Sequence, residues 1–141
     1  MTTNAPADAV SPKNDENPSY TFDPALIANQ GRSVGVVLGA RLCEAAKAKL
    51  KGAPEELTYE ELHKLFKTHC AGQEGYLSPQ HPVLETVVRI LLAAPEDAVP
   101  LSEIFEQVSN LWLTSAWSPS LNSSAMRRLL DHAGAQGITR A

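Results

Sequence analysis

The hydrophobic positions in the last sixty residues recur with the period of amphipathic helices. Three runs show this pattern: Pro82–Ala94, Leu101–Trp112 and Asn122–His132. Val99–Pro100 is a short extended step between the first two runs, and Ile138–Thr139–Arg140 predicts a strand after the third. Only Glu85, Thr86 and Arg89 of the first run look solvated, so we expect that run to be the central helix.

A second helical region is predicted between residues 23 and 51. Asp23–Pro24 is a typical helix start, with Asp as N-cap and Pro at the first helical position. The run continues to about Lys51, but it contains Gly31, Gly35 and Gly39 at a spacing of four. Each glycine costs a helix about 1 kcal/mol relative to alanine. We therefore expect a break at Gly31, with Gly35 and Gly39 available for close approach by a second helix.

The clearest local signal is the start of the next helix. Thr58 followed by Glu61 three residues later predicts a capping box, and Leu57 with Leu62 predicts the hydrophobic staple around it. This helix should run to about His69 and be followed by a glycine-containing loop over residues 71–75.

The first 22 residues differ from the rest in composition. Prolines and small polar residues predominate, and such a segment cannot bury enough apolar area to offset its ordering entropy. We expect a disordered tail over 1–22, in which Tyr20 and Phe22 pack on the first helix. The sequence thus divides into this tail, a helical part over 23–78 and a module over 79–141. The predicted fold class is all-α or mainly helical, a helical bundle with that C-terminal module.

The end of the chain resembles a known family. Ser123–Gly134, with its polar face, paired leucines and glycine cap, followed by Ile138–Thr139–Arg140, resembles the recognition helix and strand of winged helix-turn-helix domains. Two features depart from that pattern: Leu113–Leu121, which contains Trp117, is a long linker, and the sequence ends at the strand that would enter the wing. The resemblance implies a binding module. Similar long-linker modules in some methyltransferases and oxygenases serve dimerisation or partner contact.

Charge changes how this resemblance is interpreted. The 141-residue chain has a formal net charge of −4, and residues 79–141 hold four basic and six acidic side chains. Non-specific DNA affinity comes mainly from phosphate neutralisation by Lys and Arg. Glu103 and Glu106 lie on the helix that would cross the phosphate backbone. Residues 24–78 are nearly balanced, and their most basic run is Lys47, Lys49 and Lys51.

If the module bound DNA, its contacts would come from the third helix. The candidate residues there are Ser123, Ser124, Arg127 and Arg128. The alternative is that Arg127 forms an ordinary ion pair with Asp131, four residues later. The charge balance favours this alternative.

Metal and thiol chemistry are weaker hypotheses. His63, His69, Cys70 and His81 are close in sequence, but their spacing matches no common zinc pattern. Cys43 and Cys70 fall in separate predicted helices, and we interpret both as reduced thiols of a cytoplasmic protein. The sequence predicts no cofactor, and no apolar run approaches the roughly 20 residues that span a bilayer. A small metal- or thiol-dependent enzyme is the third and least favoured hypothesis.

The favoured hypothesis is a non-catalytic partner-binding subunit or adaptor, with a protein partner or self-association. Its predicted contact surfaces are the helix face with Gly35 and Gly39 and an exposed aromatic loop from Trp112 to Trp117. The other interpretation of the two tryptophans is a place in the core, and the sequence favours that place over a contact role. The alternative is a DNA-binding transcriptional regulator, disfavoured by the acidic charge.

Overall fold

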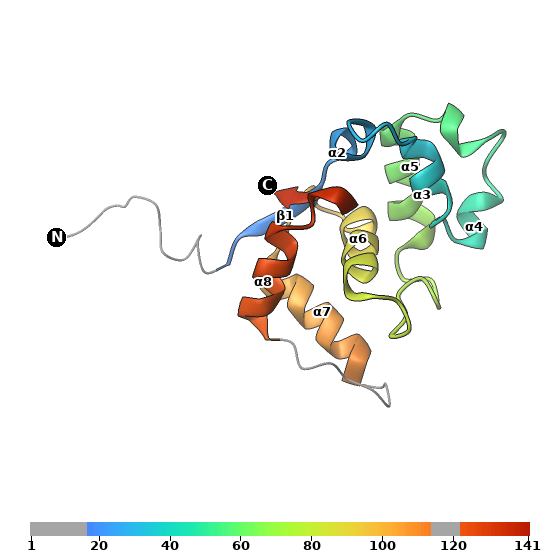
Figure 1. Ribbon diagram of the computed structural model, residues 1–141. Coiled ribbons are helices and arrows are strands. Elements are labelled where there is room, and N and C mark those ends of the chain that lie inside the picture. The colour runs from blue at the N-terminus through green and yellow to red at the C-terminus, as the bar shows by residue number, and fades with distance from the viewer. Residues whose placement is uncertain (1–16, 114–121) are drawn as a thin grey trace.

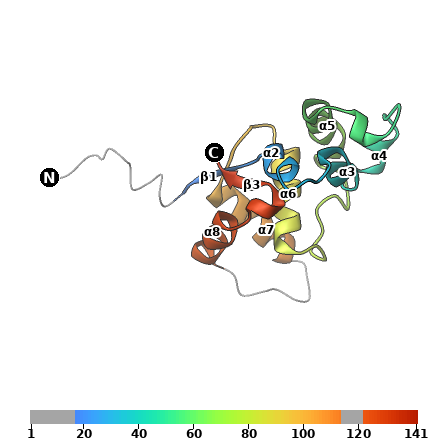
Figure 2. The same cartoon turned by 45° about the horizontal axis from the view of Figure 1, so that its top comes forward.

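The computed structural model describes residues 17–113 and 122–141 (Figure 1). The expectations for residues 1–16 and for Trp117 lie outside this part of the chain. Among the described residues the chain is mainly helical, as predicted, and it also contains a three-stranded sheet. Helices α3 to α5 gather at one end of the molecule and α7 and α8 at the other, with α6 between them (Figures 1 and 2).

The first helix begins and ends where local signals predict. In α2 (Pro24–Ala28), the Asp23 side chain accepts a hydrogen bond from the Ala25 N–H at 3.0 Å. The chain then turns at Gly31, whose φ of 77° favours glycine, so the predicted break is confirmed.

The segment breaks again beyond Gly31, which its sequence does not indicate. It forms two short helices, α3 (Val34–Gly39) and α4 (Glu44–Lys47), instead of one helix reaching Lys51. Ser33 caps α3 by accepting a hydrogen bond from the Val36 N–H at 3.2 Å. The second break redirects the chain so that the residues after α3 can pack against α5 and its last turn.

The predicted capping box is confirmed. A 3₁₀ turn, η1 (Pro54–Glu56), leads into α5 (Tyr59–Leu65). At the start of α5, Thr58 Oγ1 accepts from the Glu61 N–H at 3.2 Å, and Glu61 Oε1 accepts from the Thr58 N–H at 2.9 Å. The helix continues into one π-helical turn, η2 (Phe66–Cys70), and ends one residue beyond its predicted end.

The C-terminal elements follow the predicted order, and their bounds agree to within one residue. They are α6 (Val83–Ala93), β2 (Val99–Pro100), α7 (Leu101–Leu113), α8 (Ser123–Asp131) and β3 (Ile138–Arg140). Gly134 was expected to cap α8, but it begins a further 3₁₀ turn, η3 (Gly134–Gln136), and His132 occupies the cap position. The left-handed backbone conformation that typically ends a helix is found at Gly137, which follows η3 and has a φ of 87°.

The prediction of disorder up to Phe22 is wrong for the last residues of that segment. Ser19–Phe22 forms β1, the middle strand of the sheet, whose order is β2-β1-β3. Both neighbours pair with it in antiparallel register: Tyr20 lies opposite Val99 on β2 and opposite Arg140 on β3. Tyr20 and Phe22 are buried, and two paired strands with two buried aromatic rings offset the ordering entropy that the composition implied.

This pairing also changes the predicted organisation of the chain. Residues 19–22 join the elements of the 79–141 module, and the Asp23 N–H donates to the Gly137 carbonyl at 2.8 Å. The aromatic residues of β1 therefore pack against the C-terminal elements as well as near the first helix. Phe22 also stacks on Tyr59 of α5, with ring centroids 5.9 Å apart, so β1 connects the two ends of the molecule.

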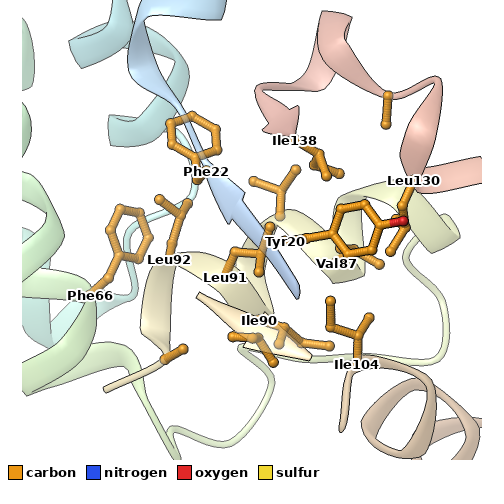
Figure 3. Packing of buried hydrophobic residues seen from close by; sticks show 14 of the residues in the cluster. Tyr20, Phe22, Phe66, Val87, Ile90, Leu91, Leu92, Ile104, Leu130 and Ile138 are labelled. Carbon is orange, nitrogen blue, oxygen red and sulfur yellow. The ribbon is translucent and has the colours of Figure 1, made fainter. Parts of the chain in front are cut away.

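Helix α6 lies at the centre of one hydrophobic core, as its pattern predicted. Its buried residues meet Tyr20 and Phe22 of β1, Ile104 of α7 and Leu130 of α8 (Figure 3). Thr86 was expected to face solvent, but it is fully buried, and its hydroxyl donates to the Pro82 carbonyl at 3.1 Å. That bond within the helix satisfies the buried hydroxyl, so a threonine fits on the inner face.

Candidate functional site

A recess lined by several charged side chains lies between the end of α4 and the outer face of α5. We call it the lysine groove; it has a volume of about 520 Å³. One wall is the segment after α4, and the other is the α5–η2 helix. The lining residues are Lys49, Leu50, Lys51, Leu57, Glu61, Lys64, Leu65, Thr68 and His69.

The floor of the lysine groove is apolar. Leu50, Leu57 and Leu65 are half-buried and pack against the main core while still lining the recess. Four of the wall residues are spaced i, i+3, i+4 and i+7 from Glu61 to Thr68, so they form one stripe along the helix. This stripe is a signal that the sequence carried and that our interpretation missed.

The rim of the groove is cationic. Lys49, Lys51 and Lys64 are exposed, and none of them forms a salt bridge with another residue in the described part of the chain. The one carboxylate on the lining, Glu61, is occupied by the capping box at the start of α5. The groove therefore combines an apolar floor with three available positive charges.

A second polar cluster ties the segment after α3 to α6. Glu85 Oε2 accepts from Arg41 Nε at 2.7 Å and from Arg89 Nε at 2.8 Å, and Glu85 Oε1 accepts from Arg41 Nη2 at 2.7 Å. Arg89 also donates to the Tyr76 carbonyl at 3.0 Å. Burial acts to raise the pKa of Glu85, but the hydrogen bonds and charges of the two arginines outweigh it and lower that pKa. The carboxylate is thus held charged by its partners, which is typical of a structural ion pair.

Two cysteines from different segments meet beside this cluster. The Sγ atoms of Cys43, at the start of α4, and Cys70, at the end of η2, lie 2.8 Å apart as free thiols. The Cys43 N–H donates to Cys70 Sγ at 3.2 Å, and the Cys43 thiol contacts the His69 carbonyl at 3.3 Å. Burial, together with the hydrogen bond to Cys43, raises the pKa of Cys70 to about 12. The sequence did not indicate that the two thiols meet.

The glycine face expected to bind a partner is covered by this chain. Gly35 and Gly39 are buried, and a Cβ added at Gly35 would lie 2.3 Å from Glu55 Cα and 2.7 Å from the Pro54 carbonyl oxygen. At Gly39 it would lie 2.6 Å from Pro54 Cβ. The close approach was predicted correctly, but the neighbour is the η1 turn and not a partner helix.

Of the two interpretations of the tryptophans, the structure supports the core position for Trp112. Trp112 is buried near the end of α7, with 6% of its surface exposed, so it belongs to the core. Its indole nitrogen has no hydrogen-bond partner among the described residues. Trp117, the second residue of that predicted surface, lies outside the described part.

The residues proposed for DNA contact lie together on one face of α8. Ser123, Ser124 and Arg127 line a recess of about 260 Å³ beside Leu101, and Arg128 is exposed. Asp131 forms its salt bridge with Arg140 instead of the expected Arg127, although the positive charge of Arg127 also acts to lower the pKa of Asp131.

Asp131 instead joins α8 to the sheet. Arg140 donates to both of its carboxylate oxygens at 2.9 Å, and the Tyr20 hydroxyl donates to Oδ1 at 2.7 Å. The hydrogen bonds from Arg140 and then Tyr20 outweigh burial and lower the pKa of Asp131. Arg140 is therefore engaged within the fold.

The histidines and Cys70 do not form a metal site. In the described part of the chain, no group of three or more His, Cys, Asp or Glu side chains is arranged to hold a metal ion. His63 stacks on Tyr59 with ring centroids 5.2 Å apart, and burial lowers the pKa of His63 and of His81. His69 lines the lysine groove.

Comparisons with known proteins add no relative: no family model, curated protein or solved structure matches the chain. None of the described helices is both long and apolar enough to cross a bilayer.

Proposed function

We propose that this protein is a non-catalytic partner-binding subunit or adaptor, and that the lysine groove binds an acidic amphipathic segment of a protein partner. The observation that carries the proposal is the combination of an apolar floor with three lysines, Lys49, Lys51 and Lys64, that form no salt bridge with any residue the structure describes. A segment with acidic side chains along one edge and apolar side chains facing the floor matches both features.

The size of the groove sets what such a segment can place in it. A volume of about 520 Å³ accommodates a few anchoring side chains rather than a whole helix. We expect one or two apolar anchors on the floor, with carboxylates reaching the lysines. The lysine stems would cover part of the anchors while their ammonium groups remain solvated.

A binding titration tests the proposal. The probe is a fluorescein-labelled helical peptide with Leu at every third or fourth position and Glu elsewhere, followed by anisotropy. A peptide with Lys in place of Glu controls for charge, and a scrambled peptide of the same composition controls for amphipathicity. We expect binding of the first peptide only, weakening as salt rises.

Charge-reversal variants locate the binding surface. Each exposed ion pair is worth about 0.2–1 kcal/mol, so the combined variant Lys49→Glu/Lys51→Glu/Lys64→Glu should lose about tenfold or more in affinity. The matched pair is Lys64→Glu and Lys67→Glu, which make the same change of charge on the same helix, because Lys67 is exposed but does not line the groove; Lys67→Glu serves as the control. Equal affinities for the triple variant and the control would contradict the proposal.

The second candidate is a DNA-binding regulator with a winged-helix-like C-terminal module, and the position of β1 supports it. In a winged helix, the strand after the third helix enters a hairpin, whose return strand would pair antiparallel with it. Here β3 follows the third helix, and β1 is its antiparallel partner. We propose that β1 takes the place of the return strand of the wing by pairing with β3.

DNA binding by this module is tested separately. Anisotropy with a labelled random-sequence duplex, at low and then physiological salt, should detect salt-sensitive binding in the range of about 10⁻⁴ to 10⁻⁶ M if the module binds DNA. The Arg127→Glu/Arg128→Glu variant should then lose that binding. An affinity unchanged by the double reversal would eliminate α8 as the reading helix.

A further inference from the structure

We propose that Cys43 and Cys70 form a reversible thiol–disulfide pair that is oxidised by a low-molecular-weight disulfide such as glutathione disulfide. The pair bridges two segments that are separate in sequence, the start of α4 and the end of η2. This inference is independent of the lysine groove and of the adaptor proposal.

Geometry favours a disulfide between the Sγ atoms of Cys43 and Cys70 over a disulfide to another chain. The Sγ atoms are 2.8 Å apart, so they need to approach by only about 0.8 Å to reach disulfide bonding distance. Cys70 is fully buried, which prevents it from reaching a cysteine of another molecule. A bond within the chain is therefore the only disulfide open to Cys70 in the folded protein.

The two thiols differ in access, and this difference assigns their roles. Cys43 is half-buried and lines a recess of about 300 Å³ together with Arg41, Tyr76 and Arg89, whereas Cys70 does not line it. A small disulfide can enter that recess and meet Cys43 first. Cys43 is thus the attacking thiol and Cys70 the resolving thiol.

The exchange proceeds in two balanced steps. The Cys43 thiolate attacks one sulfur of the disulfide RSSR, which forms a mixed disulfide and releases RS⁻. Cys70 then attacks Cys43 Sγ, forms the Cys43–Cys70 bond and releases the second RS⁻. The protons of the two thiols go to the two released thiolates, so the protein loses two electrons and two protons while RSSR becomes two RSH. The Cys43 N–H, 3.2 Å from Cys70 Sγ, can stabilise negative charge there during the second step.

The test equilibrates the folded protein with mixtures of reduced and oxidised glutathione and then quenches it with an alkylating agent. Mass spectrometry of the digested protein should find the two cysteine peptides joined under oxidising mixtures and released by reductant. The oxidised form should also have a thermal midpoint higher by about 10 °C or more, since the bond closes a loop from residue 43 to residue 70.

Single-cysteine variants test the assigned roles. Cys70→Ala should accumulate the glutathione adduct at Cys43, whereas Cys43→Ala should form at least tenfold less adduct. If a variant fails to fold, the order of alkylation in the parent protein serves instead, with Cys43 expected to react first. Equal reactivity of the two thiols, disulfide-linked dimers, or no joined peptides under oxidising mixtures would overturn the proposal.

Discussion

Replacing Tyr20 tests whether β1 is an integral part of the folded core. The side chain is fully buried, and its hydroxyl donates to Asp131 at 2.7 Å. Truncating a large buried aromatic side chain costs about 3–5 kcal/mol, so Tyr20→Ala should remove that much from the free energy of unfolding. A domain typically has only about 5–15 kcal/mol, so this is a large fraction of its stability.

Tyr20→Phe separates packing from hydrogen bonding. It keeps the ring and removes the hydroxyl, so it should cost only the hydrogen bond to the carboxylate. We expect about 1–2 kcal/mol, near the lower end for a charged partner because Asp131 keeps Arg140 and remains partly exposed. The phenylalanine variant should therefore lie clearly between the parent and Tyr20→Ala.

Urea unfolding followed by far-UV circular dichroism and tryptophan fluorescence measures these differences. Val36→Ala is the control, because Val36 is 53% exposed on α3 and its truncation should change stability by no more than about 0.5 kcal/mol. A loss below about 1 kcal/mol for Tyr20→Ala, similar to the control, would show that β1 is not part of the cooperative fold.

Three further predictions concern other contacts. Gly35→Ala should destabilise the protein by about 1–3 kcal/mol in thermal unfolding, since its Cβ would collide with the η1 backbone, whereas Gly134→Ala, with open space around it, should be nearly neutral. The pKa of Glu85 is lower in the folded state than in the unfolded state, so Glu85 stabilises the fold fully above its unfolded pKa and this stabilisation is lost as pH falls through the folded pKa. Glu85→Gln should therefore flatten the dependence of the urea midpoint on pH between pH 7 and 3. An unchanged pH dependence would contradict the role given to the pairing of Glu85 with Arg41. Thr58→Ala should cost about 0.5–2 kcal/mol in the same urea assay, with Thr58→Ser close to the parent, and equal losses for both would argue against the cap.

Features decided by a few neighbouring residues were predictable from the sequence. The caps at Asp23 and Thr58 and the break at Gly31 each depend on contacts within about four residues. The helical period likewise located α6, α7 and α8 to within one residue. Such features follow from propensity and spacing, which a single sequence records directly.

Features decided by distant residues were not predictable in the same way. The alternation of Ser19, Tyr20, Thr21 and Phe22 is compatible with a strand, but its partners, Val99 and Ile138–Arg140, are far along the chain. Proline-rich surroundings then made disorder the expected outcome. The strand forms because residues far along the chain supply its two partner strands.

The lysine groove and the cysteine pair also depend on residues that are distant in sequence, so the sequence predicted them only in part. The stripe from Glu61 to Thr68 is visible in the sequence, but the second wall depends on where the chain after α4 returns. The contact between Cys43 and Cys70 likewise requires the break after Gly39, and the glycines of this run weaken a helix without fixing where it ends. Both sites arise from the path between helices, which short-range patterns do not specify.

The central position of β1 has a consequence for biosynthesis. Tyr20 is synthesised about 120 residues before its partner Arg140. At about 5–20 residues per second, the aromatic strand waits roughly 6–24 s before its sheet can close. During that interval β1 lacks its β3 partner throughout, and it also lacks β2 until residue 100 has been added. Newly made chains should therefore depend on a holding chaperone more than refolded ones, in which all three strands are present from the start.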